Sequence, residues 1–332
     1  MQNLDSQHNN YCPLIFHGIY SERQLNGKLS ISPCCLAKQS AAELIDFEGD
    51  AYLKTLREEN KNNLRSSACN ACWSLEDKDG ESKRKVTIDW YKNNNIIQDY
   101  SAKLYHVDYN TLPICNAKCV ICSPKYSSTW AATTKNYNIK DLLKFDYKHL
   151  DSMDFSNVKQ LYFNGGEPLM TNEHVAVMKE INNLAEVDIM YNTNGSCYPN
   201  TEVLELWKMA KSVTIFFSID GIGKRFEETR TPLKWNIVST NMQKINDLSY
   251  INVHCSYTIG KHNVYDLEDT INWFNKLPNF NTLEKFHVHY VVPGHGLYFN
   301  TASADELSEF KNEMLKFNNY YWYSSISNSM TL

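Results

Sequence analysis

Apolar and polar residues alternate in blocks along the central part of the chain. Six short runs rich in apolar and β-branched residues recur there, and each is followed by a polar loop and a helical or mixed segment. The runs cover residues 104–109, 160–163, 187–191, 213–218, 252–259 and 287–292. Strands that alternate with crossover helices form a parallel sheet, so the pattern predicts an α/β fold. In a barrel of such units, functional side chains gather where the strands end.

The two ends of the chain have different patterns. Near the N-terminus, Asn26-Gly27 is a hairpin turn signal, and residues 28–32 alternate polar and apolar as a strand does. Residues 41–60 have one apolar side and are expected to be helical. Near the C-terminus, Ser303 followed by acidic residues predicts the start of a helix. We therefore divide the chain into an N-terminal module (residues 1–100), an α/β domain (residues 101–300), and a C-terminal helix and tail (residues 301–332).

Composition excludes several classes of protein. The 332 residues carry a net charge of −5, so no excess of basic residues draws the chain to nucleic acid or to an acidic membrane. The first ten residues are polar, unlike a signal peptide, and no apolar run approaches the ~18 residues of a membrane helix. We therefore expect a cytoplasmic protein without nucleic-acid or membrane partners. In that reducing compartment, the ten cysteines are expected to bind metal rather than form disulfides.

Three of these cysteines lie close together after the first predicted strand. Cys115, Cys119 and Cys122 follow the pattern C-x3-C-x2-C. Thiolates are the usual ligands of iron–sulfur clusters, and a [4Fe-4S] cluster held by three of them keeps one iron open for chemistry. A structural zinc site usually takes four ligands, and no further Cys or His follows closely enough to complete one. The spacing therefore favours a catalytic or redox iron–sulfur cluster.

This cysteine motif, placed after a strand, resembles the radical S-adenosylmethionine (radical SAM) superfamily. The resemblance implies a partial (β/α)6 TIM-like barrel built on the six predicted strands. It also implies that SAM binds the open iron of a [4Fe-4S] cluster. An electron, supplied by an external flavodoxin- or ferredoxin-type donor, would cleave SAM to methionine and a 5'-deoxyadenosyl radical that abstracts a substrate hydrogen. Family members often have an aromatic residue before the third cysteine, where this chain has Ile121.

The loop after the second predicted strand fits the same resemblance. Its sequence, Asn164-Gly165-Gly166-Glu167-Pro168, matches the GGEP motif of the family. That match implies that Gly165, Gly166 and Glu167 bind the amino group of SAM. Glycine also suits this role because it lets the backbone approach a ligand without a side chain in the way.

Polar residues after the third and fourth strands are further candidates for binding SAM. Asn192 and Asn194 follow the third strand, and Ser218 follows the fourth; we expect all three to contact the carboxylate or the ribose of SAM. Asp220 is a candidate contact to SAM or to the substrate. Arg230 either pairs with the SAM carboxylate through its planar guanidinium or lies at the surface.

A second group of cysteines lies in the N-terminal module. Cys12, one of Cys34 and Cys35, Cys69 and Cys72 offer four ligand positions. Four thiolates suit either a closed iron–sulfur cluster or a structural zinc ion, and spacing alone leaves both open. The module resembles the auxiliary-cluster domains called SPASM and twitch domains, here placed before the barrel rather than after it. That resemblance implies a second [4Fe-4S] cluster.

The substrate is the least determined part of the sequence interpretation. Auxiliary clusters of this kind often accompany the modification of peptides by crosslinking, epimerisation or oxidation, so a peptide is our first expectation. A radical SAM dehydrogenase or cyclase acting on a sugar, nucleotide or other small molecule is the alternative. An electron-transfer protein without SAM turnover is a third, and the GGEP motif argues against it. Cys197 and Cys255 are either buried apolar residues or hydrogen donors to a substrate radical, and His254 is structural or an acid–base group.

Overall fold

The computed structural model describes residues 10–23, 29–40, 47–96, 98–135, 153–291 and 295–330. Its centre is one eight-stranded sheet with the order β2-β1-β3-β4-β5-β6-β7-β8. The edge strand β2 is antiparallel to β1, and every other neighbouring pair is parallel. Among the described residues, no pairing joins β2 to β8, so the sheet is open rather than a closed barrel. The predicted α/β fold with a parallel sheet is confirmed.

The strands are β1 (Gly18–Arg23), β2 (Leu29–Ser32), β3 (His106–Asn110), β4 (Gln160–Asn164), β5 (Asp188–Thr193), β6 (Ser212–Ser218), β7 (Ile251–Ile259) and β8 (Phe286–Tyr290). The α-helices are α1 (Pro13–His17), α2 (Ala51–Lys61), α3 (Asn70–Glu76), α4 (Lys83–Asn93), α5 (Ser128–Thr133), α7 (Glu173–Lys179), α8 (Thr201–Met209), α9 (Gly223–Thr229), α10 (Trp235–Asn246), α11 (Leu267–Phe274), α12 (Thr282–Lys285), α13 (Ala304–Met314) and α14 (Tyr323–Ser329). All six predicted strands are present as β3 to β8.

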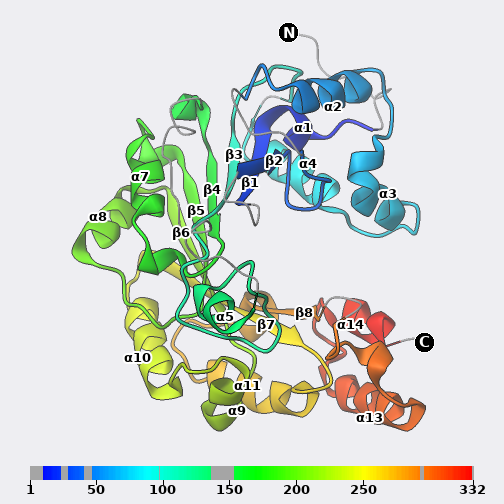
Figure 1. Cartoon of the computed structure of the whole chain (residues 1–332), viewed down its shortest axis with the longest axis vertical. Coiled ribbons are helices and arrows are strands. Elements are labelled where there is room, and N and C mark those ends of the chain that lie inside the picture. The colour runs from blue at the N-terminus through cyan, green and yellow to red at the C-terminus, as the bar shows by residue number, and fades with distance from the viewer. Residues whose placement is uncertain are drawn as a thin grey trace.

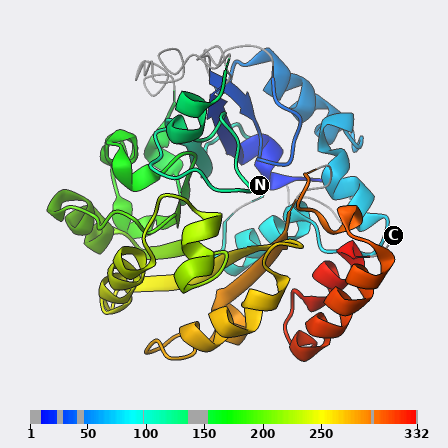
Figure 2. The ribbon, with the colours of Figure 1, turned by 60° about the horizontal axis from the view of Figure 1, so that its bottom comes forward.

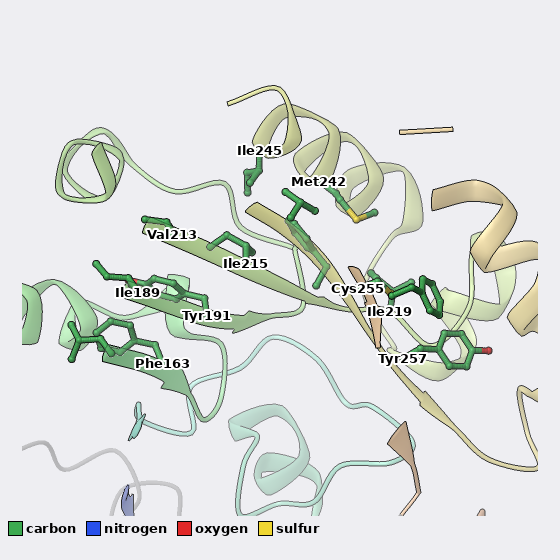
Figure 3. Packing of buried hydrophobic residues seen from close by; sticks show 14 of the residues in the cluster. Phe163, Ile189, Tyr191, Val213, Ile215, Ile219, Met242, Ile245, Cys255 and Tyr257 are labelled. Atoms are coloured by element: carbon green, nitrogen blue, oxygen red, sulfur yellow. The ribbon is translucent and has the colours of Figure 1, made fainter. Parts of the chain in front are cut away.

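Alternation of side chains along the strands gives the sheet one apolar face and one polar face. In β6, every second residue is buried, and Val213, Ile215 and Phe217 point to the helix-covered side. Figure 3 shows this packing, in which Met242 and Ile245 of α10 lie over the strands. In Figure 1, α7, α8 and α10 lie on the outer side of the curved sheet. The opposite face carries the polar side chains, and we call the space in front of that face the lumen.

Cys255 belongs to the apolar face. It is fully buried in the core shown in Figure 3, on the side of β7 away from the lumen. A role as a buried apolar residue follows, because a hydrogen donor to a substrate radical has to face the lumen. Cys197 lies in the loop after β5, is partly buried, and has its sulfur 3.8 Å from the Ser196 hydroxyl.

The N-terminal module shares the sheet of the α/β domain. β1 pairs with β3 over Gly18–Ser21, so the sheet includes strands from both sides of residue 100. The division of the chain into domains at that residue stays a prediction. β2 confirms the predicted strand near residues 28–32, whereas the predicted turn at Asn26-Gly27 lies outside the described residues. The predicted helix over 41–60 is represented by α2, and residues 41–46 also lie outside. Figure 2 shows the module and the C-terminal helices at neighbouring positions around the same ring of elements.

The C-terminal segment packs on the last strand. The predicted helix start at Ser303 is confirmed by α13, where Ser303 and Glu306 form a capping box. The indole N–H of Trp322 donates to the carbonyl of Phe286 at 2.9 Å, which fixes the segment before α14 against β8. Within the described ranges, no helix has the length and apolar character needed to cross a membrane.

Candidate active site

The loop after β3 holds the three clustered cysteines in a fixed conformation. Cys115 and Cys119 are buried, Cys122 is partly buried, and all three line one cavity of about 590 Å³. The loop is held at Cys115, whose backbone N–H donates to the Ser128 hydroxyl at 3.1 Å. The Trp130 indole also donates to the carbonyl of Cys119 at 2.8 Å. Helix α5 therefore holds the backbone at the first and second cysteines of the motif, and all three cysteines line the cavity.

The three thiols suit a cluster better than a single ion. Burial raises the pKa of Cys115 to about 11 and that of Cys119 to about 12, so both are protonated at neutral pH until a metal displaces the protons. The described residues contain no set of three His, Cys, Asp or Glu side chains close enough to hold one metal ion. A four-iron cluster spreads its ligands over separate irons, so it accepts thiolates that are farther apart. The donor set and the cavity therefore fit a [4Fe-4S] cluster.

The loop after β4 packs on the cysteine loop at Gly165 and Gly166. A Cβ on Gly165 would lie 2.6 Å from the Thr111 carbonyl oxygen, and one on Gly166 would lie 2.4 Å from that of Ile114. Gly165 also has a φ of +112°, which other residues rarely adopt. Glycine is therefore required here for the two loops to meet, and both glycines line the cavity.

Glu167 lies behind the cavity rather than on its wall. Its carboxylate is completely buried. It accepts hydrogen bonds from the Thr193 hydroxyl at 2.7 Å, the Asn194 N–H at 2.7 Å and the Leu169 N–H at 3.2 Å. Burial raises the pKa of Glu167, and these donors favour the charged form. Glu167 therefore ties the loop after β4 to the loop after β5, and its predicted contact with SAM stays a prediction.

Amide and hydroxyl side chains from the next strands line the same cavity. Asn192, Asn194 and Ser218 all line it, and their predicted contact with SAM stays a prediction. The Asn194 amide nitrogen lies 3.7 Å from the sulfur of Cys115 and 3.1 Å from Oδ1 of Asn116. This contact extends the Glu167 tie to the first cysteine, so three loops are connected through hydrogen bonds.

Asp220 and Arg230 form a buried ion pair beside the second cysteine. Nη2 of Arg230 lies 2.6 Å from Oδ2 of Asp220, and Nη1 lies 3.7 Å from the sulfur of Cys119. Burial alone would lower the pKa of Arg230, but the Asp220 carboxylate outweighs it and the pKa is raised. Arg230 is therefore a cavity residue rather than a surface residue. Asp220 is fully buried and also accepts a hydrogen bond from the Thr258 N–H at 2.9 Å. It therefore orients the guanidinium of Arg230.

Comparison with known proteins places this site in a family. Residues 109–274, half of the chain, match the Radical SAM superfamily, and this segment contains the cysteine loop and every cavity residue named above. The chain belongs to the radical SAM superfamily. Membership implies a [4Fe-4S] cluster and SAM as cofactors. No curated protein matches the chain.

Solved radical SAM structures are similar to this one at low sequence identity. Native anSMEcpe with bound AdoMet is 15% identical, with a TM-score of 0.43, and the match covers 65% of this chain and 59% of that one. SuiB of Streptococcus suis bound to S-adenosylmethionine is 11% identical, with a TM-score of 0.35 and coverage of 90% and 67%. SuiB bound to its precursor peptide SuiA is also 11% identical, with a TM-score of 0.40 and coverage of 90% and 68%. The chain thus spans about three fifths of the length of anSMEcpe.

The N-terminal cysteines of this radical SAM protein surround a second, much smaller cavity. Cys12, Cys34, Cys69 and Cys72 line a space of about 20 Å³. Cys35, which the sequence left as an equal candidate to Cys34, is exposed and does not line it; its sulfur accepts from Nζ of Lys83 at 3.1 Å. Burial raises the pKa of Cys34 to about 11 and that of Cys69 to about 12.

Two residues that support the cysteine loop, Glu22 and Tyr126, were not predicted from the sequence. Glu22 of β1 is buried and bonds to the hydroxyl of Tyr126 and, at 2.9 Å, to Nζ of Lys125. Tyr126 lines the cluster cavity. Glu22 lies about a hundred residues before Lys125 and Tyr126, so no local pattern predicts these contacts. The N-terminal module therefore makes a direct contact with the cysteine loop.

Proposed function

We propose that this protein cleaves SAM reductively at a [4Fe-4S] cluster held by Cys115, Cys119 and Cys122, and that it uses the resulting radical to abstract a substrate hydrogen. This proposal is supported mainly by the observation that the three thiols share one cavity with Gly165 and Gly166, at the ends of the parallel strands. When bound, the cluster supplies the electron that converts SAM to methionine and a 5'-deoxyadenosyl radical.

The residues of the chain bind and orient SAM. The backbone beside Gly165 and Gly166 is free of side chains, so it can receive the amino group of SAM. The guanidinium of Arg230, held by Asp220, is placed to pair with the carboxylate. Asn192, Asn194 and Ser218 offer amide and hydroxyl groups to the ribose. Ile121 also lines the cavity and provides an apolar surface for the adenine.

The N-terminal module is proposed to hold a second [4Fe-4S] cluster on Cys12, Cys34, Cys69 and Cys72. Four thiols around one cavity support a closed metal site. A structural zinc ion, which takes the same four ligands, is the alternative; the described thiols would have to move closer together to hold one ion.

A peptide is the substrate that we propose first. The cavity wall beyond the cysteines is formed mostly by neutral amide and hydroxyl groups. Among the described residues that line it, Arg230 is the only Arg or Lys. Peptides present amides and carbonyls that such groups match, whereas a nucleotide phosphate usually meets several cations.

Metal analysis of anaerobically reconstituted protein tests the two metal sites. Wild type should contain about eight irons, and Cys115→Ala/Cys119→Ala/Cys122→Ala should contain about four. About four irons plus zinc in wild type would make the N-terminal site structural. A triple variant with unchanged iron would place the cluster elsewhere and contradict the assignment. Cys197→Ser, a partly buried cysteine outside both cavities, is the matched control and should keep all its iron.

A further inference from the structure

Two histidines lie side by side on the lumen face of the last two strands. His254 alternates with buried residues of β7, and His287 alternates with buried residues of β8, so both side chains point to the lumen. Their rings are stacked, with centroids 5.0 Å apart and an angle of 5° between the ring planes. Nδ1 of His254 lies 2.7 Å from Nε2 of His287, so one ring donates a hydrogen bond to the other.

A tyrosine of the C-terminal segment extends this pair to the surface. The hydroxyl of Tyr321, which lies before α14, is hydrogen-bonded to Nδ1 of His287. Tyr321 is 62% exposed, whereas both histidines are partly buried. At the other end, Nε2 of His254 has no hydrogen-bond partner among the described residues and is not one of their enclosed ring nitrogens, so it is open to the lumen. The three side chains therefore form a continuous hydrogen-bonded chain from the surface to the lumen, which we call the histidine relay.

The histidine relay is next to the cluster cavity. Ser218 of β6 is the register partner of Ser256 of β7, and Ser256 is the register partner of His287. Both serines line the cluster cavity. Neighbouring strands lie about 5 Å apart, so His287 continues the row of lumen side chains that forms the cavity wall. His254 is two residues before Ser256 on the same face of β7. The relay therefore begins beside the place where SAM is proposed to bind.

Either histidine alone would be a weak base. Burial is the main reason why the pKa of His254 and that of His287 are lowered to about 4; Lys285 also lowers the first, and His289 the second. Both rings are therefore neutral at pH 7, and a single ring would hold an added proton poorly. In a hydrogen-bonded chain, each ring that gains a hydrogen at one nitrogen can pass on the hydrogen of the other, so no buried ring has to stay charged.

We propose that the histidine relay accepts a proton from the substrate at Nε2 of His254 and releases a proton to solvent at Tyr321. As the substrate proton binds Nε2, the Nδ1 hydrogen of His254 moves to Nε2 of His287. The Nδ1 hydrogen of His287 then moves to the oxygen of Tyr321, whose own hydroxyl hydrogen passes to water. All three side chains end neutral, and the reverse shift restores them once the product has left. Because bound SAM and substrate exclude water from the lumen, the relay gives the proton a way out.

This inference rests on the proposed function, and it narrows the reaction to an oxidation. A substrate that gives a hydrogen atom to the deoxyadenosyl radical and a proton to His254 has one electron left over. An oxidised iron–sulfur cluster, such as the one proposed for the N-terminal cysteines, would accept that electron. Crosslinking and dehydrogenation have this balance. Epimerisation does not, because a hydrogen atom returns to the substrate and no proton is released.

Nitrogen NMR tests the direction of the histidine relay without knowledge of the substrate. Reconstituted protein is labelled with nitrogen-15 in its histidine rings, and the two signals are assigned with His254→Gln and His287→Gln. At pH 7 both rings should be neutral. The hydrogen between them should belong to Nδ1 of His254, which leaves a lone pair on Nε2 of His254, as a base requires.

Exchange of this bridging hydrogen in deuterated water tests proton transfer itself. Tyr321→Phe keeps the ring that meets His287 edge-on but removes the hydroxyl, so exchange should slow about tenfold. Tyr265→Phe is the matched control, because its exposed hydroxyl bonds to Glu309, outside the relay, and it should exchange as wild type does. If the histidines only pack together, their hydrogen exchanges when the structure opens, and Tyr321→Phe would leave the rate unchanged or raise it.

Two results would overturn the proposal: a hydrogen on Nε2 of His254 in wild type, or exchange in Tyr321→Phe that is no slower than in wild type. The first result comes from wild type alone, so it stands even where a variant fails to fold. The same wild-type preparation is assayed for 5'-deoxyadenosine with SAM and dithionite. Deoxyadenosine together with either overturning result would remove the histidine relay alone. The expected NMR results without deoxyadenosine would remove the proposed SAM cleavage alone.

Discussion

Replacement of Glu167 should destabilise the protein through the loops around the cluster cavity. The buried carboxylate accepts three hydrogen bonds, two of them 2.7 Å long. Glu167→Ala leaves these donors unpaired in the interior, at about 1–3 kcal/mol each, for a total of roughly 3–9 kcal/mol. That is a large part of the ~5–15 kcal/mol that stabilises a typical domain. Glu167→Gln keeps one acceptor oxygen and the shape, so it should cost about 1–3 kcal/mol.

Urea unfolding of the metal-free protein under anaerobic conditions measures this effect. The expected order of midpoints is wild type, then Glu167→Gln, then Glu167→Ala. Glu202→Ala is the matched control, because this half-exposed carboxylate bonds only to the surface residue Lys179 in the described structure, and its loss should cost less than about 1 kcal/mol. A Glu167→Ala midpoint equal to that of wild type would refute the view that Glu167 joins the two loops.

Gly166, Arg230 and the buried histidines give further measurable expectations. Gly166→Ala should cost about 1–3 kcal/mol in urea unfolding, since its Cβ would meet backbone at 2.4 Å; an unchanged midpoint would show that the cysteine loop yields. Arg230→Lys keeps the charge but loses the planar fork, so calorimetry should find SAM binding weakened about tenfold, and wild-type affinity would contradict the assigned role. Burial lowers the pKa of His17 to about 4, of His106 to about 3 and of His174 to about 4, below the unfolded value near 6.5. The unfolded state therefore binds more protons, and stability should fall as the pH is lowered from about 6.5 toward 4; a flat stability profile over that range would contradict their neutral burial.

The six strands of the α/β domain were predictable because their apolar face is continuous. Alternation in β6 and β7 follows directly from burial against the helices, and the glycines of the GGEP motif mark a close approach of two loops. The strand β1 (Gly18–Arg23) was not predicted, because its sequence is short and mostly polar. Its buried Glu22 bonds to Gln39 and to Lys125 and Tyr126 in the cysteine loop, far along the chain.

The direction of individual side chains could not be predicted from the motifs. The GGEP match gives the position of Glu167 but not that its carboxylate faces Thr193, which comes from the next strand. Likewise, Cys34 and Cys35 are neighbours in sequence, and only the structure shows that Cys34 lines the cysteine cavity whereas Cys35 bonds to Lys83. Such choices depend on long-range packing that a local pattern does not contain.

Production of 5'-deoxyadenosine tests the central claim most directly. Reconstituted protein is incubated anaerobically with SAM and dithionite, and the product is quantified by chromatography and mass spectrometry. Wild type and Cys197→Ser should form deoxyadenosine, and Cys115→Ala/Cys119→Ala/Cys122→Ala should form none. Absence of deoxyadenosine from wild type with a full complement of iron, or its undiminished formation by the triple variant, would contradict the account.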